Sequence, residues 1–145
     1  MRCPTCKKEG SFRPWEGMTD VMGIEIKGRG ERCSSCGEIL MRLSEHGRQE
    51  RLVAEQLVAR GIRSGREFKF VRKTAGLRAN EVADMFGVRK ETVSRWERDE
   101  VEIPRTAAYA LGELFTHPKL ARQRLEAFAA GARPPGSWAG RTGAR

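Results

Sequence analysis

Four cysteines near the N-terminus carry the clearest chemistry in the chain. They form two Cys-x-x-Cys pairs, Cys3 with Cys6 and Cys33 with Cys36, and 26 residues separate the pairs. A Cys-x-x-Cys turn directs two thiolates toward one point, so two such turns can complete a tetrahedral zinc shell. Gly37 follows the second pair directly, where such a turn favours a residue without a side chain. We therefore predict one structural Zn²⁺ ion bound by all four cysteines.

Other uses of these cysteines fit the pattern less well. Disulfides are typical of secreted proteins, and the N-terminal sequence MRCPTCKKEG lacks the apolar segment of a signal peptide. A thioredoxin-type redox pair requires a βαβ setting, which the pattern does not indicate. A catalytic zinc ion keeps one position for water, whereas four cysteines close the shell. No cluster of histidines and carboxylates accompanies them, so we expect no enzyme activity.

The segment that must position these thiolates, residues 1–43, is short. It cannot bury enough apolar surface to fold alone, and zinc would supply the deficit with roughly 10–16 kcal/mol. Residues 21–27 alternate imperfectly between apolar and polar and predict a short strand. Its acidic and basic side chains are nearly balanced, which favours a protein partner over a phosphate backbone. Two interpretations of Trp15, Met18 and Met22 stay open: they are anchors for a partner, or they cover a small core.

A second functional pattern lies in residues 77–100, LRANEVADMFGVRKETVSRWERDE. Val82, Ala83 and Phe86 recur at helical spacing, and Gly87 is a natural helix stop. Val93 and Trp96 lie three residues apart and mark the inner face of a second helix. The outer face of that helix is polar and consists of Lys90, Glu91, Ser94, Arg95 and Arg98. We predict a helix-turn-helix whose second helix is exposed for DNA.

Helical patterns dominate the rest of the chain. We predict a connecting segment over residues 44–63 that is helical from 44 to 60, a helical DNA-binding domain over 64–130 and a disordered tail over 131–145. Five helices fit the domain: 64–75, 79–86, 90–99, 104–115 and 118–129. Its predicted core is Phe68, Val71, Leu77, Val82, Phe86, Val88, Val93, Trp96, Ile103, Leu111 and Leu114. Leu120, Leu125 and Phe128 give the last helix an apolar face of its own.

The overall charge indicates an anionic partner. The 145 residues carry a formal net charge of +9, with an isoelectric point near 10.0, which favours nucleic acid. The mean hydropathy is −0.59, and we expect no transmembrane helix. With no signal peptide expected either, we expect the chain in a reducing cytoplasm.

At this point two family resemblances emerge. Residues 64–115 resemble the lambda-repressor-like (Cro/cI, XRE-type) helix-turn-helix, with VSRWERDE close to that family's recognition-helix ending. Residues 1–130 are similar to the MqsA-type (YgiT) antitoxin family, on the motifs CPTC, CSSCGE, FVRKTAGLRANEVADMFGV, VSRWERDE and HPKLARQRLEAF. The expected fold is thus a small zinc-ribbon-like β/irregular domain followed by an all-α, five-helix, lambda-repressor-like domain.

The second resemblance implies a homodimeric antitoxin. In that family the zinc domain is a platform for a cognate toxin, an RNA-cleaving enzyme, and the helical domain represses the shared promoter by binding a palindromic operator. By position, Arg95 matches the arginine that reaches a base edge, and Asn80 lies where relatives often place a phosphate-contacting Gln. The candidate DNA-binding residues are Asn80, Arg89, Lys90, Glu91, Thr92, Ser94, Arg95 and Arg98.

This chain also departs from the family. Arg78 and Arg89 stand where relatives usually have a capping Thr or Ser, which suggests that phosphate contact is favoured over capping. The acidic residues 97, 99, 100 and 102 follow the recognition helix and should point away from DNA. Two other functions remain open: a stand-alone zinc-containing XRE-family regulator without a toxin, and an RNA-binding zinc ribbon, for which Phe12 and Trp15 give only slight support.

Overall fold

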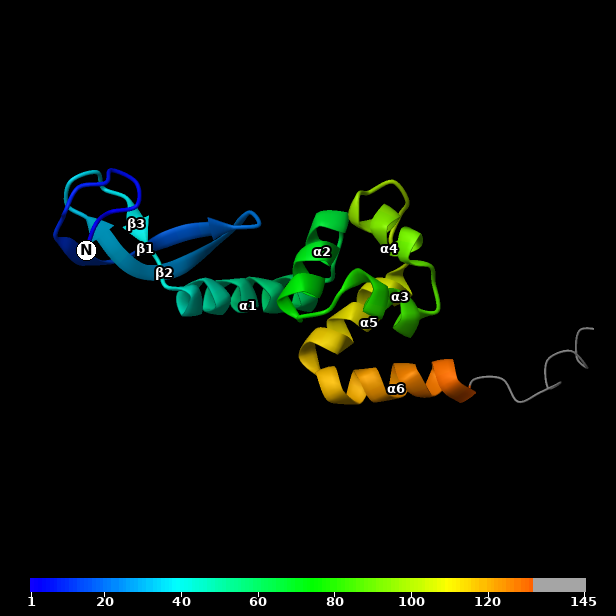
Figure 1. The fold of residues 1–145 in the computed structure, drawn as a ribbon. Coiled ribbons are helices and arrows are strands. Elements are labelled where there is room, and N and C mark those ends of the chain that lie inside the picture. The colour runs from blue at the N-terminus through cyan, green and yellow to red at the C-terminus, as the bar shows by residue number, and fades with distance from the viewer. Residues whose placement is uncertain (132–145) are drawn as a thin grey trace, which may run out of the picture. The chain divides into compact units, whose positions relative to one another are not determined.

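Two compact units make up the protein, Met1–Leu57 and a second that begins at Val58 (Figure 1). The computed structural model describes residues 1–131. Of the predicted disordered tail, 131–145, Gly131 is the last residue of a helix and the rest lies outside the described residues. No helix in the described part of the chain is both long and apolar enough to cross a bilayer.

The first unit is built on a three-stranded antiparallel sheet. Strands β1 (Phe12–Val21) and β2 (Ile24–Cys33) form a long hairpin, and the short β3 (Ile39–Leu40) pairs with the other edge of β2. One Cys-x-x-Cys turn precedes β1, and the other lies between β2 and β3. A small sheet with two cysteine turns confirms the expected zinc-ribbon-like architecture.

The strand predicted for residues 21–27 is only partly correct: Val21 ends β1 and residues 24–27 begin β2, but a hairpin turn at Met22 and Gly23 interrupts the segment. Met22 and Gly23 occupy the turn with φ values of 57° and 76°, the left-handed region that a type I′ hairpin turn requires at both positions. The Asp20 carboxylate accepts a hydrogen bond from the Gly23 N–H at 3.2 Å. Methionine is an unusual residue in such a turn, so the sequence lacks the Asn-Gly signal that marks most of them.

The two faces of the hairpin differ in character. On one face the Glu16 carboxylate lies 3.6 Å from Lys27 Nζ and 3.7 Å from Arg29 Nε, and all three side chains are exposed. On the other face Ile26 and Gly28 are buried. A Cβ atom at Gly28 would lie 2.5 Å from the Gln49 side-chain nitrogen. A side chain at position 28 would have to displace the Gln49 amide, so glycine favours the close approach of helix α1 (Leu43–Arg60) to the sheet.

All six predicted helices are present, with ends shifted by at most two residues. After α1 come five helices that form the helical domain (Figure 1): α2 (Gly65–Thr74), α3 (Ala79–Phe86), α4 (Lys90–Glu97), α5 (Arg105–Thr116) and α6 (Pro118–Gly131). Helices α3 and α4 pack on each other, α2 packs on α4 and α5, and α6 packs on α5 and α3.

Most of the predicted core of the helical domain is buried. Phe86, Val88 and Ile103 are only half-buried, while Met85, which the pattern did not single out, is buried. The rings of Phe68 and Trp96 meet edge to face with centroids 5.8 Å apart, which joins α2 to α4. The apolar side chains of α6 lie mainly outside: Leu120 is 47% exposed and Phe128 is 72% exposed.

The helix starts show how this chain replaces missing caps. Ser64 Oγ accepts a hydrogen bond from the Glu67 N–H at 3.2 Å, as predicted for the start of α2. At the start of α3, the Arg78 guanidinium has no acceptor atom and cannot cap the helix. Instead, the Glu81 carboxylate accepts a hydrogen bond from the Arg78 N–H at 3.1 Å. That bond is the half of a capping box in which the glutamate reaches backward.

The Glu81 carboxylate should therefore make a pH-dependent contribution to stability. Its pKa is lowered from the ordinary 4.5, chiefly by the Arg78 N–H and further by the charges of Arg78 and Arg122. A lowered carboxyl pKa means that the ionised form stabilises the folded state above pH 4.5, and that this contribution disappears as the pH falls through the lowered pKa. We expect Glu81→Ala to reduce the Tm at pH 7 and to approach the wild type at acid pH.

Thermal unfolding followed by far-UV circular dichroism over a pH series measures this difference. Glu81→Gln is the matched control, because the amide oxygen can still accept the Arg78 N–H but carries no charge. At pH 7, the Tm of Glu81→Gln should lie below that of the wild type by less than the Tm of Glu81→Ala does. A difference between wild type and Glu81→Ala that stays constant down to pH 3 would contradict the role assigned to the ionised carboxylate.

Candidate metal centre and nucleic-acid interface

The structure brings all four cysteine sulfurs to one point. Their Sγ atoms all lie within 4.8 Å of one another, with 3.7 Å between Cys3 and Cys36 and 4.0 Å between Cys6 and Cys33. None of the four is in a disulfide. A tetrahedral ion with metal–sulfur bonds of about 2.3 Å requires sulfurs about 3.8 Å apart. The donor set therefore fits a closed, four-sulfur metal centre.

The two cysteine turns have the same backbone geometry. The Lys7 N–H donates to the Cys3 carbonyl and the Gly37 N–H donates to the Cys33 carbonyl, each at 2.9 Å. Lys7 and Gly37 both have positive φ, 62° and 76°. The second turn follows the glycine preference expected from sequence, while the first places a lysine in the same strained region. A hydrogen bond from the Ser34 N–H to the Ser11 carbonyl, 3.1 Å long, ties the second turn to the start of β1.

Backbone N–H groups point at the sulfurs and favour their ionised form. The Cys36 N–H, together with that of Ser35, lowers the pKa of Cys33 to about 7, and the Cys6 N–H lowers the pKa of Cys3. For Cys36, the Glu38 N–H acts in the same direction, but burial and the three neighbouring thiols outweigh it and raise the pKa to about 11. A bound divalent cation would supply the positive charge that four converging thiolates need.

Helix α4 presents a polar face to solvent. Val93 and Trp96 are buried, whereas Glu91, Arg95 and Arg98 are exposed and Thr92 and Ser94 are half-buried. At about 100° per residue, positions 91, 94, 95 and 98 fall within one narrow arc of the helix. The turn before α4 begins at Gly87, whose φ of 67° ends α3. The buried and exposed faces of α4 are thus the ones predicted from the sequence pattern.

The other candidate contact residues surround the start of this helix. Asn80 is exposed in the first turn of α3, and Arg89 and Lys90 are exposed where α4 begins. Within residues 1–131, neither Arg89, Lys90 nor Arg95 forms an ion pair, whereas Arg98 Nε lies 3.3 Å from Glu100. The charges of Arg89 and Lys90 are therefore directed to solvent at the positive end of the α4 dipole, an arrangement that suits a phosphate backbone, while Arg95 lies in the last turn of the helix.

Two of the four acidic residues at the end of α4 and after it, Glu97 and Asp99, make contacts inside the domain. The Glu97 carboxylate is buried and accepts hydrogen bonds from the Arg72 guanidinium, with Nε at 3.0 Å. Arg72 also donates to the Leu77 carbonyl at 2.9 Å. Asp99, at a φ of 55°, accepts the Gly65 N–H at 2.8 Å. Glu100 and Glu102 are exposed, so the orientation of the acidic cluster relative to DNA stays a prediction.

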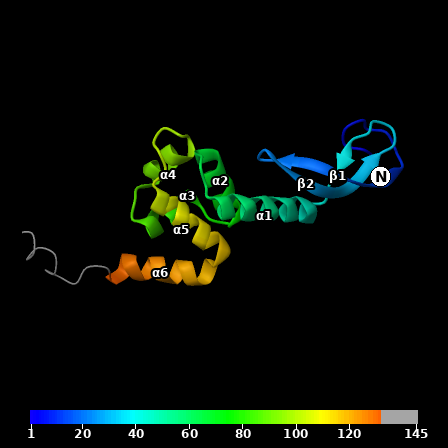
Figure 2. The same ribbon diagram turned by 180° about the vertical axis from the view of Figure 1, so that it is seen from behind.

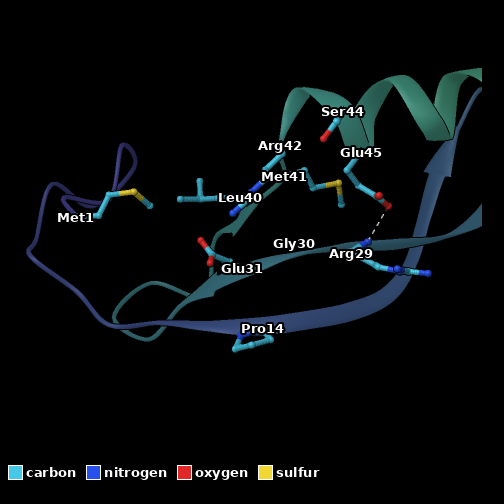
Figure 3. Close-up of a pocket in the computed structure, with 10 residues that line it drawn as sticks. All are labelled: Met1, Pro14, Arg29, Gly30, Glu31, Leu40, Met41, Arg42, Ser44 and Glu45. Carbon is cyan, nitrogen blue, oxygen red and sulfur yellow. Dashed lines mark hydrogen bonds between the residues drawn. The ribbon is translucent and has the colours of Figure 1, made fainter.

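A hollow of about 580 Å³ lies beside β3 and the start of α1 in the first unit (Figure 3). Along its wall the Arg29 N–H donates to the Glu45 carboxylate at 3.0 Å. Arg48, which does not line the hollow, donates to the same carboxylate and to the Lys27 carbonyl, the latter at 2.7 Å. The Arg48 guanidinium lowers the pKa of Glu45 to about 2. Glu45 and Arg48 thus form hydrogen bonds with backbone groups of β2 in the part of the strand that β3 does not pair with. The sequence showed only an i,i+3 charge pair on a helix, which does not reveal this role.

Comparison with known proteins agrees with this arrangement. A family model described as the antitoxin component of the bacterial toxin–antitoxin system, MqsA, matches residues 1–124. No curated protein matches the chain. The family groups components of toxin–antitoxin systems and is not a family of enzymes. The match includes both cysteine pairs, the three-stranded sheet and helices α1 to α5. On this match, the chain belongs to the MqsA antitoxin family.

Proposed function

We propose that this protein is a sequence-specific DNA-binding antitoxin that represses its own operon and binds a cognate toxin through its metal domain. The observation that carries the proposal is the match of residues 1–124 to the MqsA antitoxin family. The exposed basic face of α4 supports the DNA-binding half of the proposal. The closed four-sulfur site supports a structural role for the metal.

In the DNA-binding half, α4 is the recognition helix and enters the major groove. The Arg95 guanidinium reads a guanine through O6 and N7, the commonest specific contact in protein–DNA complexes. Glu91 and Thr92 lie beside it and affect the choice of neighbouring bases. The remaining candidates contact phosphates and set the register: Asn80, Arg89, Lys90, Ser94 and Arg98. A homodimer places two such helices on the half-sites of a palindromic operator.

In the metal-binding half, Zn²⁺ is the proposed ion, held by Cys3, Cys6, Cys33 and Cys36. Four thiolates in a tetrahedron suit zinc, which has no redox chemistry and no open coordination position at such a site. The toxin would then dock on a surface whose shape depends on the metal. Met18 is 60% exposed and Trp15 is half-buried. The two side chains lie on opposite faces of β1, so a toxin docked on one face of the strand would contact only one of them.

Purification of the tagged full-length chain from its own cells tests the proposal. Mass spectrometry should find one protein that co-purifies in a fixed ratio, is toxic when expressed alone, and is neutralised by the wild type but not by Cys33→Ser. Footprinting should show protection of a palindrome upstream of the gene. A chain that protects such DNA but retains no protein partner would favour the stand-alone XRE-family regulator instead.

Arg89 offers a test of whether phosphate contact has replaced capping. It stands at the N-cap of α4 with extended backbone angles, φ −78° and ψ 151°, and its side chain makes no capping bond. We expect Arg89→Ser to stabilise the protein by about 0.5–2 kcal/mol, because a serine oxygen can accept a helix N–H. The same variant should weaken DNA binding, because one positive charge at the helix start is lost.

Denaturant unfolding and fluorescence anisotropy with operator DNA measure these two effects. Arg89→Ala is the matched control: it removes the same charge without adding a cap. It should weaken DNA binding to a similar degree and give no gain in stability. Tighter DNA binding by Arg89→Ser than by the wild type would refute the phosphate contact.

A further inference from the structure

The Glu91 carboxylate is an acidic group on the otherwise basic outer face of α4. Glu91 is exposed in the first turn of this helix. Within residues 1–131 its side chain forms no hydrogen bond and no ion pair. At about 100° per residue, it lies on the same side of the helix as Arg95 and Arg98. Because a carboxylate is repelled by phosphates, the phosphate contact proposed for Arg89 does not suit Glu91.

The spacing of Glu91 and Arg95 makes the lack of an ion pair between them informative. A glutamate four residues before an arginine is the favourable order for a helical ion pair. Three other pairs of opposite charges, three or four residues apart in the described helices and their caps, do make contact: Glu45 with Arg48, Arg78 with Glu81 and Arg122 with Glu126. Glu91 and Arg95 stay apart, so each side chain is free to contact a group of its own.

The start of α4 is on the open side of the helical domain. Buried Val93 and Trp96 turn the inner side of α4 toward α2 and α3. In both views of this domain, α5 lies between α4 and α6 (Figures 1 and 2). The exposure of Glu91 and Arg95 therefore reflects an outer face that no other helix of the domain covers. In helix-turn-helix proteins, the N-terminal residues of the recognition helix contact base edges.

The chemistry of a carboxylate restricts the base that Glu91 can contact. An ionised carboxylate only accepts hydrogen bonds. In the major groove guanine presents two acceptors, and thymine presents an acceptor beside a methyl group, so neither base donates to it. Adenine offers the N6 donor, but its N7 acceptor lies next to N6 and repels a carboxylate. Cytosine presents the N4 donor and no acceptor of its own, so its edge matches Glu91.

We propose that Glu91 is a specificity-determining residue that accepts a hydrogen bond from N4 of a cytosine in each operator half-site. Glu91 and Arg95 are about 6 Å apart along the helix axis, and successive base pairs are about 3.4 Å apart. The cytosine therefore lies within about two base-pair steps of the guanine that Arg95 contacts. The inference deepens the proposed function, on which it rests, because it names a second base of the operator.

The same carboxylate disfavours DNA of other sequences. Opposite guanine or thymine, Glu91 would lose its hydration and face an acceptor, which costs free energy without a new hydrogen bond. A contact that penalises the wrong partner contributes to specificity as much as one that favours the right partner. Replacing Glu91 by alanine should therefore strengthen binding to scrambled DNA while it removes the preference for cytosine.

Selection of binding sites from a random double-stranded DNA library, by the full-length, metal-loaded chain, tests the inference. The wild type should select a guanine that Arg95→Ala no longer selects and, one or two pairs away, a cytosine. Glu91→Gln should select adenine in place of that cytosine, because a glutamine amide pairs with adenine N6 and N7. In anisotropy titrations at one salt concentration, each protein should prefer its own base by about 5-fold or more. Helicity and metal content should not change, because Glu91 is exposed.

Glu102→Gln is the matched control. Glu102 is exposed, lies outside α4 and forms no ion pair in the described part of the chain, so this variant loses the same charge and should select the wild-type sites. The inference would be overturned if Glu91→Gln selected the same bases as the wild type, or if the base that changed were not a cytosine in the wild-type sites. A wild type that selects no sequence would overturn the proposed function itself, whereas selection that depends on Arg95 but not on Glu91 would overturn the inference alone.

Discussion

Replacing Arg95 by alanine is expected to abolish sequence-specific DNA binding while leaving the fold intact. Arg95 is exposed in the last turn of α4 and forms no ion pair within residues 1–131, so its truncation breaks no internal ion pair. A bidentate arginine–guanine pair contributes about 1–3 kcal/mol of discrimination, or about 5- to 150-fold in affinity. A dimer loses that contribution at both half-sites, which brings operator affinity close to the non-specific level.

Anisotropy titrations with operator and scrambled DNA, at several salt concentrations, measure the effect. Arg95→Lys keeps the charge but not the forked geometry, so it should retain affinity for scrambled DNA and still lose discrimination. Lys119→Ala removes one exposed positive charge from α6 and should change neither. If Arg95→Ala discriminated operator from scrambled DNA as well as the wild type, α4 would not be the recognition helix.

The helices and the metal ligands could be predicted because local sequence determines them. A 3.6-residue apolar period, a capping Ser64 and the stop at Gly87 act within a few residues of the chain. The cysteine turns could be predicted for the same reason, because the shape of a Cys-x-x-Cys turn depends only on its own backbone and on a following residue that tolerates positive φ. For this reason the burial of Val93 and Trp96, and the exposure of Arg95, follow the pattern without knowledge of the tertiary fold.

The rest depends on contacts between distant residues. The strands were predicted too short because a Met-Gly turn gives no strong signal and the small sheet buries few apolar side chains. Gly28 looks like an ordinary strand breaker, yet its lack of a side chain admits Gln49 of α1. Glu45 and Arg48 bind the backbone of β2, a role that depends on how α1 packs on the sheet. Met85 is buried and Phe86 only half-buried, although both are compatible with the period of α3.

The metal is expected to account for most of the stability of the first unit. Apart from Cys3 and Cys33, the one buried apolar side chain of its sheet is Ile26. Small zinc modules gain roughly 10–16 kcal/mol from the ion, which equals or exceeds the whole stability of an ordinary domain, about 5–15 kcal/mol. Cys33→Ser removes a buried ligand, so we expect this variant to lose its metal and to unfold the β1–β2–β3 sheet.

Three measurements separate the two units in that variant. Elemental analysis should fall from one zinc ion per chain to near zero, limited proteolysis should cut within the first unit, and the helical signal at 222 nm should largely remain. Operator binding should persist because the helical domain has its own core, from Phe68 to Leu114, while toxin neutralisation should be lost. Ser35→Ala changes the same turn without removing a thiol and should behave as the wild type.

If Cys33→Ser lost operator binding while Ser35→Ala kept it, the helical domain would depend on the metal domain. The proposal that the two units bind toxin and DNA independently would then be wrong.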